Sequence, residues 1–186
     1  VEHQQRVGHL LGPLPPEMRD DTAFMDRIHA YVPGWDIPKM EVALFTDHFG
    51  LVSDFLSSSW THLRAISHVQ HLHKRAILGG ALSGRDTNAV QKTVSGLLKL
   101  TYPDMNAEIP DDSIEWALRL ALESRRRVKE QQKRIGSAEF RNTHFSYTMG
   151  EEGVEKFVST PELKSEDQID PDPLPPGQVW TVTPGG

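Results

Sequence analysis

The sequence of 186 residues contains no cysteine. This excludes disulfide bonds and thiolate metal ligands, and it is compatible with the reducing cytoplasm, where we expect the protein to reside. No apolar run approaches the roughly 20 residues that a membrane-spanning helix needs, so we expect no membrane partner. The net charge is −6, so the overall basic character typical of nucleic-acid-binding proteins is missing and only a local basic patch is left to consider.

Motifs that bind nucleotide phosphates or expose a nucleophile are also missing. The sequence has no G-x-x-x-x-G-K-[ST] loop, no G-x-G-x-x-G and no G-x-S-x-G. No hydrophobic strand ends in Asp-Glu, the pair that would hold a magnesium ion. We therefore expect this chain alone to bind no cofactor and to hydrolyse no ATP.

A histidine cluster in "HVQHLH" is the only metal-site candidate, and we predict that it binds no metal. His68 and His71 share one face of a helix, so a zinc pair is conceivable. There is no H-E-x-x-H and no third carboxylate in register, which a complete zinc site would require. A surface or helix-capping role for these histidines is the favoured interpretation.

Apolar residues at helical spacing predict a mainly α fold. We expect a helix at 21–31 with N-cap oxygens from Asp20, Asp21 and Thr22, and a helix at about 46–68 that is either continuous or broken near the serine run at 57–59. A third helix, capped by Asp86 or Thr87, ends at Pro103. A fourth, capped by Asp111 or Asp112 with Glu115 in a capping-box-like position, ends at Gly136. The third helix has the stripe Val90, Val94, Leu97 and Leu98, and the fourth has Ile114, Ala117, Leu118, Ala121 and Leu122. Residues 139–149 then change to a loose alternation typical of a strand. An acidic, proline-rich linker follows at 159–176.

Three groups of polar residues are candidates for chemistry. Arg27 lies at the end of the first short helix, either as an ordinary exposed ion or as an arginine that reaches the γ-phosphate of ATP on an adjacent subunit. Gln91 and Lys92 lie in the first turns of the third helix, from which a cation can meet a phosphate. The basic run contains Arg125, Arg126, Arg127, Lys129, Lys133 and Arg134. The favoured interpretation is a solvated helix end. The alternative, which would assign a function to these residues, is contact with DNA phosphates.

Several segments together resemble a known family. In order, these are "FMDRIHAYVPGWDIPK", "RDTNAVQKTVSGLLKL", "ALESRRRVKEQQKRIG", "HFSY" and "LPPGQVWTV". They resemble the Lon-related AAA+ protein of BREX phage-defence systems, over nearly all of the chain. The start at Val1 and the end at "TVTPGG" add the expectation that the sequence is a fragment of a longer protein.

The resemblance implies an architecture of a helical AAA+ lid with part of the α/β ATPase core. Residues 1–40 would end the large ATPase subdomain, 41–136 would form the helical lid, and 137–158 a short β segment. Residues 159–176 would be the linker, and 177–186 the start of a Lon-like domain. The Walker motifs would precede the chain, and any Ser-Lys peptidase dyad would follow it.

The resemblance also implies roles and partners. Arg27 falls where AAA+ rings place the arginine finger in trans, and Lys92, or Gln91 beside it, falls where the lid presents its sensor-2 cation. The full-length protein would bind ATP and magnesium, form a homo-oligomeric ring with a hexamer as the expected size, and act on DNA with other BREX proteins. Arg125, Arg126, Arg127 and Lys129 are the candidate DNA contacts. The alternatives are a helical DNA-binding or adaptor module without an ATPase role, and an ATP-dependent Lon-type protease.

Overall fold

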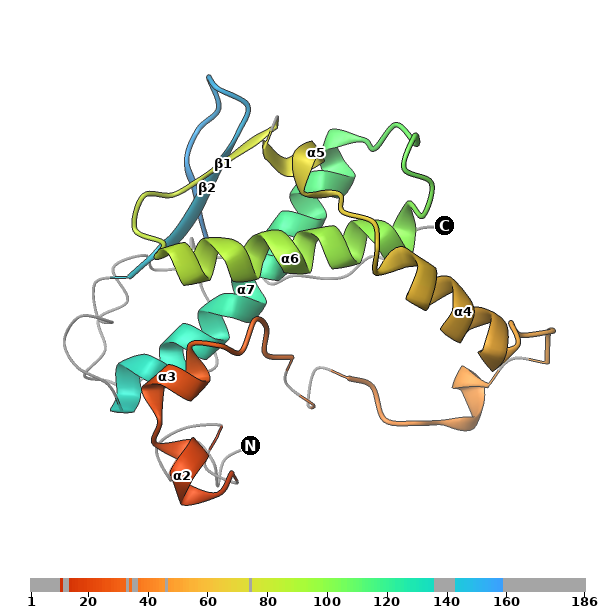
Figure 1. Ribbon diagram of the computed structural model, residues 1–186, viewed down its shortest axis with the longest axis horizontal. Coiled ribbons are helices and arrows are strands. Elements are labelled where there is room, and N and C mark those ends of the chain that lie inside the picture. The colour runs from red at the N-terminus through yellow and green to blue at the C-terminus, as the bar shows by residue number, and fades with distance from the viewer. Residues whose placement is uncertain are drawn as a thin grey trace.

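The structure is a computed structural model that describes residues 11, 14–32, 34, 37–45, 47–73, 75–135 and 143–158. This part of the chain is mainly helical with a small sheet, which confirms the predicted class (Figure 1). The elements follow the order α2 (Pro16–Arg19), α3 (Thr22–Met25), the 3-10 turn η2 (Val42–Leu44), α4 (Ser53–Leu63), α5 (Val69–His73), β1 (Ala76–Leu78), α6 (Gly84–Thr101), α7 (Asp111–Ile135), β2 (Phe145–Met149) and β3 (Lys156–Val158).

The core forms where α6 crosses α7 (Figure 1). Burial on each helix recurs at three- and four-residue spacing, because those positions share one face. The predicted stripes are confirmed, since the core contains Val90, Val94, Leu98, Ile114, Ala117, Leu118, Ala121 and Leu122, with Leu97 packed at its edge. The sequence pattern therefore fixes which faces of the two long helices meet.

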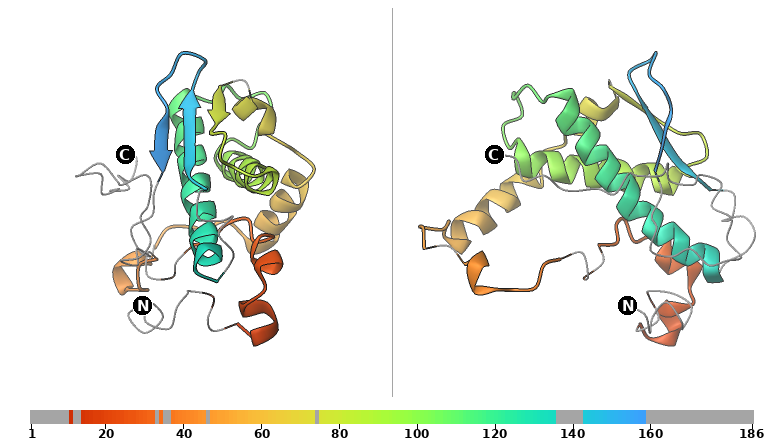
Figure 2. Two further views of the ribbon diagram at one scale, coloured as in Figure 1. Left: turned by 90° about the vertical axis from the view of Figure 1, so that its left-hand side faces the viewer. Right: turned by 180° about the vertical axis from the view of Figure 1, so that it is seen from behind.

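A three-stranded antiparallel sheet in the order β1-β2-β3 lies beside α7 (Figure 2). Ile77 pairs with Thr148, and Ser146 pairs with Phe157. Phe145 and Tyr147 of β2 are buried in the core. The strand predicted at 139–149 is confirmed for 145–149, residues 143 and 144 precede it without strand structure, and 139–142 lie outside the described residues.

The prediction of one long helix at 46–68 is wrong. α4 is restricted to Ser53–Leu63, residues 64–68 are not helical, and α5 begins at Val69. The apolar side chains that suggested the helix, such as Phe49 and Phe55, are exposed. A short helix owes most of its stability to packing of its apolar face, and among the described residues this face meets α6 only near Trp60 and Leu63, at the end of α4. α4 passes through the serine run at 57–59 without a break.

Two cap assignments also need correction. Ser83 caps α6 and forms a reciprocal capping box with Asp86, so neither Asp86 nor Thr87 is the cap. α7 begins at Asp111, which places Asp111 and Asp112 inside its first turn rather than before it. Because α7 begins at Asp111, Glu115 is its fifth residue and lies beyond the N3 position of a capping box, and its carboxylate accepts hydrogen bonds from Tyr147 and Lys156.

The first predicted helix is shorter than expected. Asp21 caps α3, as predicted, by accepting hydrogen bonds from the amides of Ala23 and Phe24. The helix then ends at Met25 instead of continuing to residue 31. Gly136, the linker at 159–176 and the segment at 177–186 lie outside the described residues, and the predicted domain boundaries stay predictions.

Candidate functional site

Five charged residues from α6, α7 and the turn after α3 form one cluster, which we call the ion cluster: Asp26, Arg85, Asp86, Arg125 and Lys129. Arg125 is at its centre and is fully buried. Its Nη2 lies 2.7 Å from Oδ1 of Asp86 and 2.8 Å from Oδ1 of Asp26. The ion cluster therefore joins the turn after α3 to both long helices.

The remaining members complete the charge pairing. Lys129 Nζ lies 3.1 Å from Oδ1 of Asp86 and 3.4 Å from Oδ1 of Asp26. Arg85 Nη1 donates to Oδ2 of Asp26 at 2.7 Å. The second carboxylate oxygen of Asp86 accepts from the hydroxyl of Ser83 at 2.6 Å. Three cations thus surround two carboxylates, and each carboxylate oxygen has a donor.

The local charges keep both carboxyl groups ionised. Burial raises the pKa of Asp26, but the hydrogen bond from Arg85 and the charges of Lys129 and Arg125 outweigh it, so its pKa lies below the ordinary 3.8. For Asp86, burial is again outweighed, here by the hydrogen bond from Ser83 together with Lys129 and Arg125, and its pKa also lies below 3.8. Both carboxyl groups of the ion cluster are therefore ionised at neutral pH.

The segment 22–31 is held along the second half of α7 by polar contacts. Arg125 donates to the carbonyl of Ile28, the amide of Tyr31 donates to the carbonyl of Ser124 at 3.0 Å, and Gln132 donates to the carbonyl of Thr22 at 3.1 Å. Contacts with residues 132, 125 and 124 of α7 follow in that order, so the segment runs antiparallel to the helix. These contacts explain why α3 ends early, because they occupy backbone groups that a longer helix would need.

Arg27 is exposed at the surface beside this buried network. Its guanidinium donates to the carbonyl of Ala23, one turn earlier in the same segment. Arg27 forms no ion pair with any residue that the structure describes. Its neighbour Asp26 is mostly buried, so the chain presents one charged side chain to the core and the next to solvent.

Lys92 lies on the same side of α6 as this segment. Lys92 follows Arg85 by seven residues, or about two turns, and the two side chains therefore share one face of the helix. Arg85, on the same face, contacts Asp26 at 2.7 Å, so this face of α6 meets the segment that carries Arg27. Burial lowers the pKa of His29 in that segment, and the charges of Lys92 and Arg125 lower it further. The structure thus brings the segment that carries Arg27 and the helix face that carries Lys92 together.

The two sensor-2 candidates differ in their surroundings. Lys92 is exposed. Gln91 is half-buried, and its Nε2 lies 2.8 Å from Nε2 of His73 on α5. Gln91 therefore ties α6 to α5, whereas the ammonium group of Lys92 is presented to solvent.

The basic run does not form a solvated helix end, and that expectation is wrong. Arg125, Arg126, Arg127 and Lys129 are all buried. Arg126 donates to the carbonyl of Val158 at 2.6 Å, and Arg127 pairs with Glu123 at 2.9 Å. Contact of these residues with DNA stays a prediction, and Arg125 in particular already directs its guanidinium to protein acceptors.

The histidines have helix-packing roles in the described structure. His68 is buried, and its Nε2 lies 2.8 Å from the carbonyl of Tyr102, the C-cap residue of α6. The rings of His68 and His71 meet edge to face at 5.3 Å. Within the described residues, no group of three or more metal-ligating side chains is assembled. No helix in the same part of the chain is long and apolar enough to cross a membrane.

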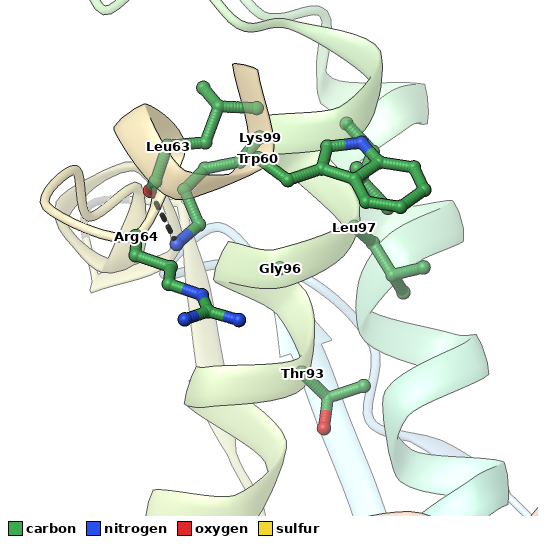
Figure 3. Close-up of a pocket in the computed structure, with 8 residues that line it drawn as sticks. Trp60, Leu63, Arg64, Thr93, Gly96, Leu97 and Lys99 are labelled. Carbon is green, nitrogen blue, oxygen red and sulfur yellow. Dashed lines mark hydrogen bonds between the residues drawn. The ribbon is translucent and has the colours of Figure 1, made fainter. Parts of the chain in front are cut away.

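A separate pocket of about 390 Å³ lies between α4 and α6 (Figure 3). Its lining is mostly apolar, with Trp60, Leu63, Leu97 and Leu100 as its largest apolar side chains. Lys99 lies at its rim and donates to the carbonyl of Leu63 at 2.9 Å, which fixes the end of α4 against α6. The pocket contains no member of the ion cluster and neither Arg27 nor Lys92, so it is not part of the candidate site.

Sequence reasoning predicted Arg27 and Lys92 as site residues, which stays a prediction, and it missed the ion cluster. Asp86 was interpreted only as a helix cap, and Arg125 only as one member of a basic run. A signal was present, because Arg125 follows Leu122 by three residues and Leu118 by seven, and Lys129 follows Arg125 by four, so both continue the buried face of α7. Asp86 likewise continues the apolar stripe of α6. When oppositely charged residues continue the buried faces of two helices that pack together, a buried ion pair between them is indicated.

Comparison with known proteins identifies the family. The family described as "Lon-like protease BrxL-like, ATPase domain" matches residues 1–146. The chain is 44% identical to the Lon-like protease BrxL of Bacillus cereus (strain H3081.97) over 180 residues, which is 97% of the chain and 26% of that protein. It is also 44% identical to the Lon-like protease BrxL of Escherichia coli O9:H4 (strain HS) over 183 residues, 98% of the chain and 26% of that protein.

The chain thus spans about a quarter of the length of these relatives. The family match covers α2 to α7 and the first residues of β2, and so contains the ion cluster, Arg27 and Lys92. The resemblance to the Lon-related proteins of BREX systems is therefore confirmed, and this chain belongs to the BrxL-like family, in its ATPase domain.

Proposed function

We propose that this chain supplies the arginine finger and the helical lid of a ring-forming AAA+ ATPase that acts on DNA in BREX anti-phage defence. The full-length protein binds ATP and magnesium through Walker residues, which this sequence does not contain. Arg27 reaches from one subunit to the γ-phosphate held by the next, and Lys92 is the sensor-2 cation of the lid. Membership of an ATPase-domain family supports the ATPase part of the proposal.

One observation carries the assignment of Arg27. Its guanidinium is exposed, donates to the carbonyl of Ala23 in its own segment and forms no ion pair with a described residue, while the backbone beside it is fixed to α7 through Asp26 and Ile28. A transition-state arginine needs this combination, because it must be free to meet a phosphate and yet held in one place.

Lys92 is preferred to Gln91 as the sensor-2 residue. Lys92 is exposed and charged, whereas Gln91 is hydrogen-bonded to His73. Of the two side chains, only the ammonium group of Lys92 carries a charge that attracts a phosphate. The side of α6 that carries Lys92 also faces the segment that contains Arg27.

The helical DNA-binding or adaptor alternative loses its main support, because the basic run on which it relied is buried. We therefore propose that any DNA contact of the ring uses surfaces other than Arg125. A Lon-type protease activity would need residues beyond this sequence, so nothing in the site favours it.

The test is Arg27→Ala in the full-length protein. ATP turnover is expected to fall by about 10³- to 10⁵-fold, the range for an arginine finger supplied in trans. Affinity for ATP should change little, because the phosphate loop belongs to the other subunit. Arg27→Lys should rescue only in part, since lysine lacks the planar guanidinium. Arg19→Ala is the matched control, because Arg19 is a surface arginine of the neighbouring helix α2 that pairs only with the adjacent Asp20 in the described structure.

Action in trans is tested by mixing. A mixture of Arg27→Ala with a Walker-lysine variant should recover part of the turnover, because some interfaces then combine an intact pocket with an intact finger. Ring assembly is measured alongside by sedimentation. Wild-type turnover by an assembled Arg27→Ala ring would refute the assignment, and Arg27 would then be an ordinary surface ion.

A further inference from the structure

The contact between the turn after α3 and the two long helices is made by charge rather than by apolar packing. Asp26 accepts from Arg85 of α6 on one oxygen, and contacts Arg125 and Lys129 of α7 on the other. Two bonds from Arg125, to Asp26 and to the carbonyl of Ile28, lie on either side of Arg27 in the chain. The backbone position of Arg27 is therefore fixed from both sides by one buried guanidinium.

Arg125 also links this turn to α6. Its Nε donates to Oδ1 of Asp86 at 2.8 Å, and Asp86 is bonded in turn to Ser83 at the start of α6. Asp86 and Arg125 are both inaccessible to solvent. Charge-assisted hydrogen bonds of this kind are directional, so a shift of α6 or α7 displaces the turn with it.

We propose that Asp26 and Arg125 are positioning residues for Arg27, which make the arginine finger move as one body with the lid helices α6 and α7. This inference rests on the proposed role of Arg27, and it adds the residues that hold the Arg27 backbone in position. Lys92 lies two turns from Arg85 on the same face of α6, so the cation that senses nucleotide and the finger share one rigid support. Nucleotide state sensed by the lid is thereby passed to the finger that serves the neighbouring subunit.

The experiment compares Asp26→Asn with Glu115→Gln in the full-length protein. Both changes remove one carboxylate charge at constant size, and both carboxylates are mostly buried and paired with a lysine. Glu115 joins α7 to the sheet and has no contact with the ion cluster. Asp26→Asn should lower kcat by about 10- to 100-fold, as expected when a reacting group is misplaced, with KM for ATP unchanged. Glu115→Gln should leave both constants near wild type.

A double-mutant cycle separates positioning from general destabilisation. If Asp26 acts through Arg27, Asp26→Asn should lower kcat much less in the Arg27→Ala background than alone. If the two substitutions lower kcat by independent factors, so that the double variant shows the full product of the single effects, the inference is overturned while the role of Arg27 is left intact. If Arg27→Ala alone keeps wild-type turnover, the proposed function itself fails. The two failures are therefore distinguishable.

A second measurement covers the case in which the Asp26→Asn ring does not assemble. The sequence has no cysteine, so Ala23→Cys creates a single labelling site on the exposed side of α3. A nitroxide spin label at this position reports the motion of the segment in the 186-residue chain itself. Asp26→Asn should narrow the label's spectrum, whereas Glu115→Gln should leave it unchanged. Identical spectra for all three proteins would overturn the inference.

Discussion

Replacing Arg125 with methionine should destabilise the chain more than its place in a basic run suggests. Methionine keeps an unbranched side chain but removes the charge and the donors that meet Asp86, Asp26 and the carbonyl of Ile28. Breaking a fully buried ion pair from one side costs about 3–5 kcal/mol, because the partner charge stays buried. Lys129 remains 3.1 Å from the same oxygen of Asp86. We therefore expect the lower end of that range, about 3 kcal/mol.

The measurement is urea unfolding at pH 7, followed by far-ultraviolet circular dichroism. A loss of about 3 kcal/mol corresponds to a fall in Tm of about 6–12 °C for a domain of this size. The midpoint should shift while the slope stays constant, since the surface exposed on unfolding is unchanged.

Arg85→Met is the matched control within the same ion cluster. Arg85 lies 2.7 Å from Asp26, as close as any pair in the cluster, but its side chain is 61% exposed. Exposed ion pairs contribute about 0–1 kcal/mol, because water screens them. Equal losses for the two variants, or a loss below about 1 kcal/mol for Arg125→Met, would refute the reasoning that burial sets the energy of this network.

Two further predictions concern pH and the sheet. The folded pKa values of Asp26 and Asp86 lie below 3.8, so the unfolded chain takes up protons first as the pH falls. The free energy of unfolding should therefore fall as the pH drops below about 4. Asp86→Asn should weaken this dependence of the free energy of unfolding on pH, measured by urea unfolding at a series of acidic pH values. Gly79→Ala would place a Cβ 1.9 Å from Oγ of Ser146, and should cost about 1–3 kcal/mol in urea unfolding. Gly80→Ala, with nothing within 4 Å, should be neutral; equal costs would contradict this account.

Local pattern predicted the core because the two long helices carry unbroken stripes. Val90, Val94 and Leu98 recur every four residues and meet Leu118 and Leu122 across the crossing. Such repeats admit one buried face per helix, so the pairing of α6 with α7 follows from them.

The same pattern failed at 46–68, where apolar spacing was equally regular. Phe49 is fully exposed, and Phe55 is more than half exposed. Spacing indicates that a face is apolar but not that another element covers it. Helix length depends on that cover as well as on local propensity, and Gly50 weakens the propensity further.

At the candidate site, sequence indicated the residue that is exposed but not the residues that hold it. Arg27 was identified from its position at a helix end and from resemblance to a family. The support from Arg125 depends on contacts with Asp26 and Asp86, which are 99 and 39 positions away in sequence. Charge type alone cannot reveal such a pairing, because an isolated run of arginines is more often solvated than buried.

The use of buried charges beside Arg27 has a physical rationale. Apolar side chains would hold the turn at least as strongly, since buried ion pairs are often no more stabilising than apolar residues of equal volume. Apolar contacts, however, tolerate sliding, whereas a guanidinium bonded to Asp26, Asp86 and the carbonyl of Ile28 accepts only one arrangement of the three elements. An arginine finger, the role proposed for Arg27, must meet a phosphate within a fraction of an ångström, and it gains more from that single arrangement than from added stability. Under that proposal, the buried charge of Arg125 is better explained by the geometry it imposes on Arg27 than by its contribution to the folding of the chain.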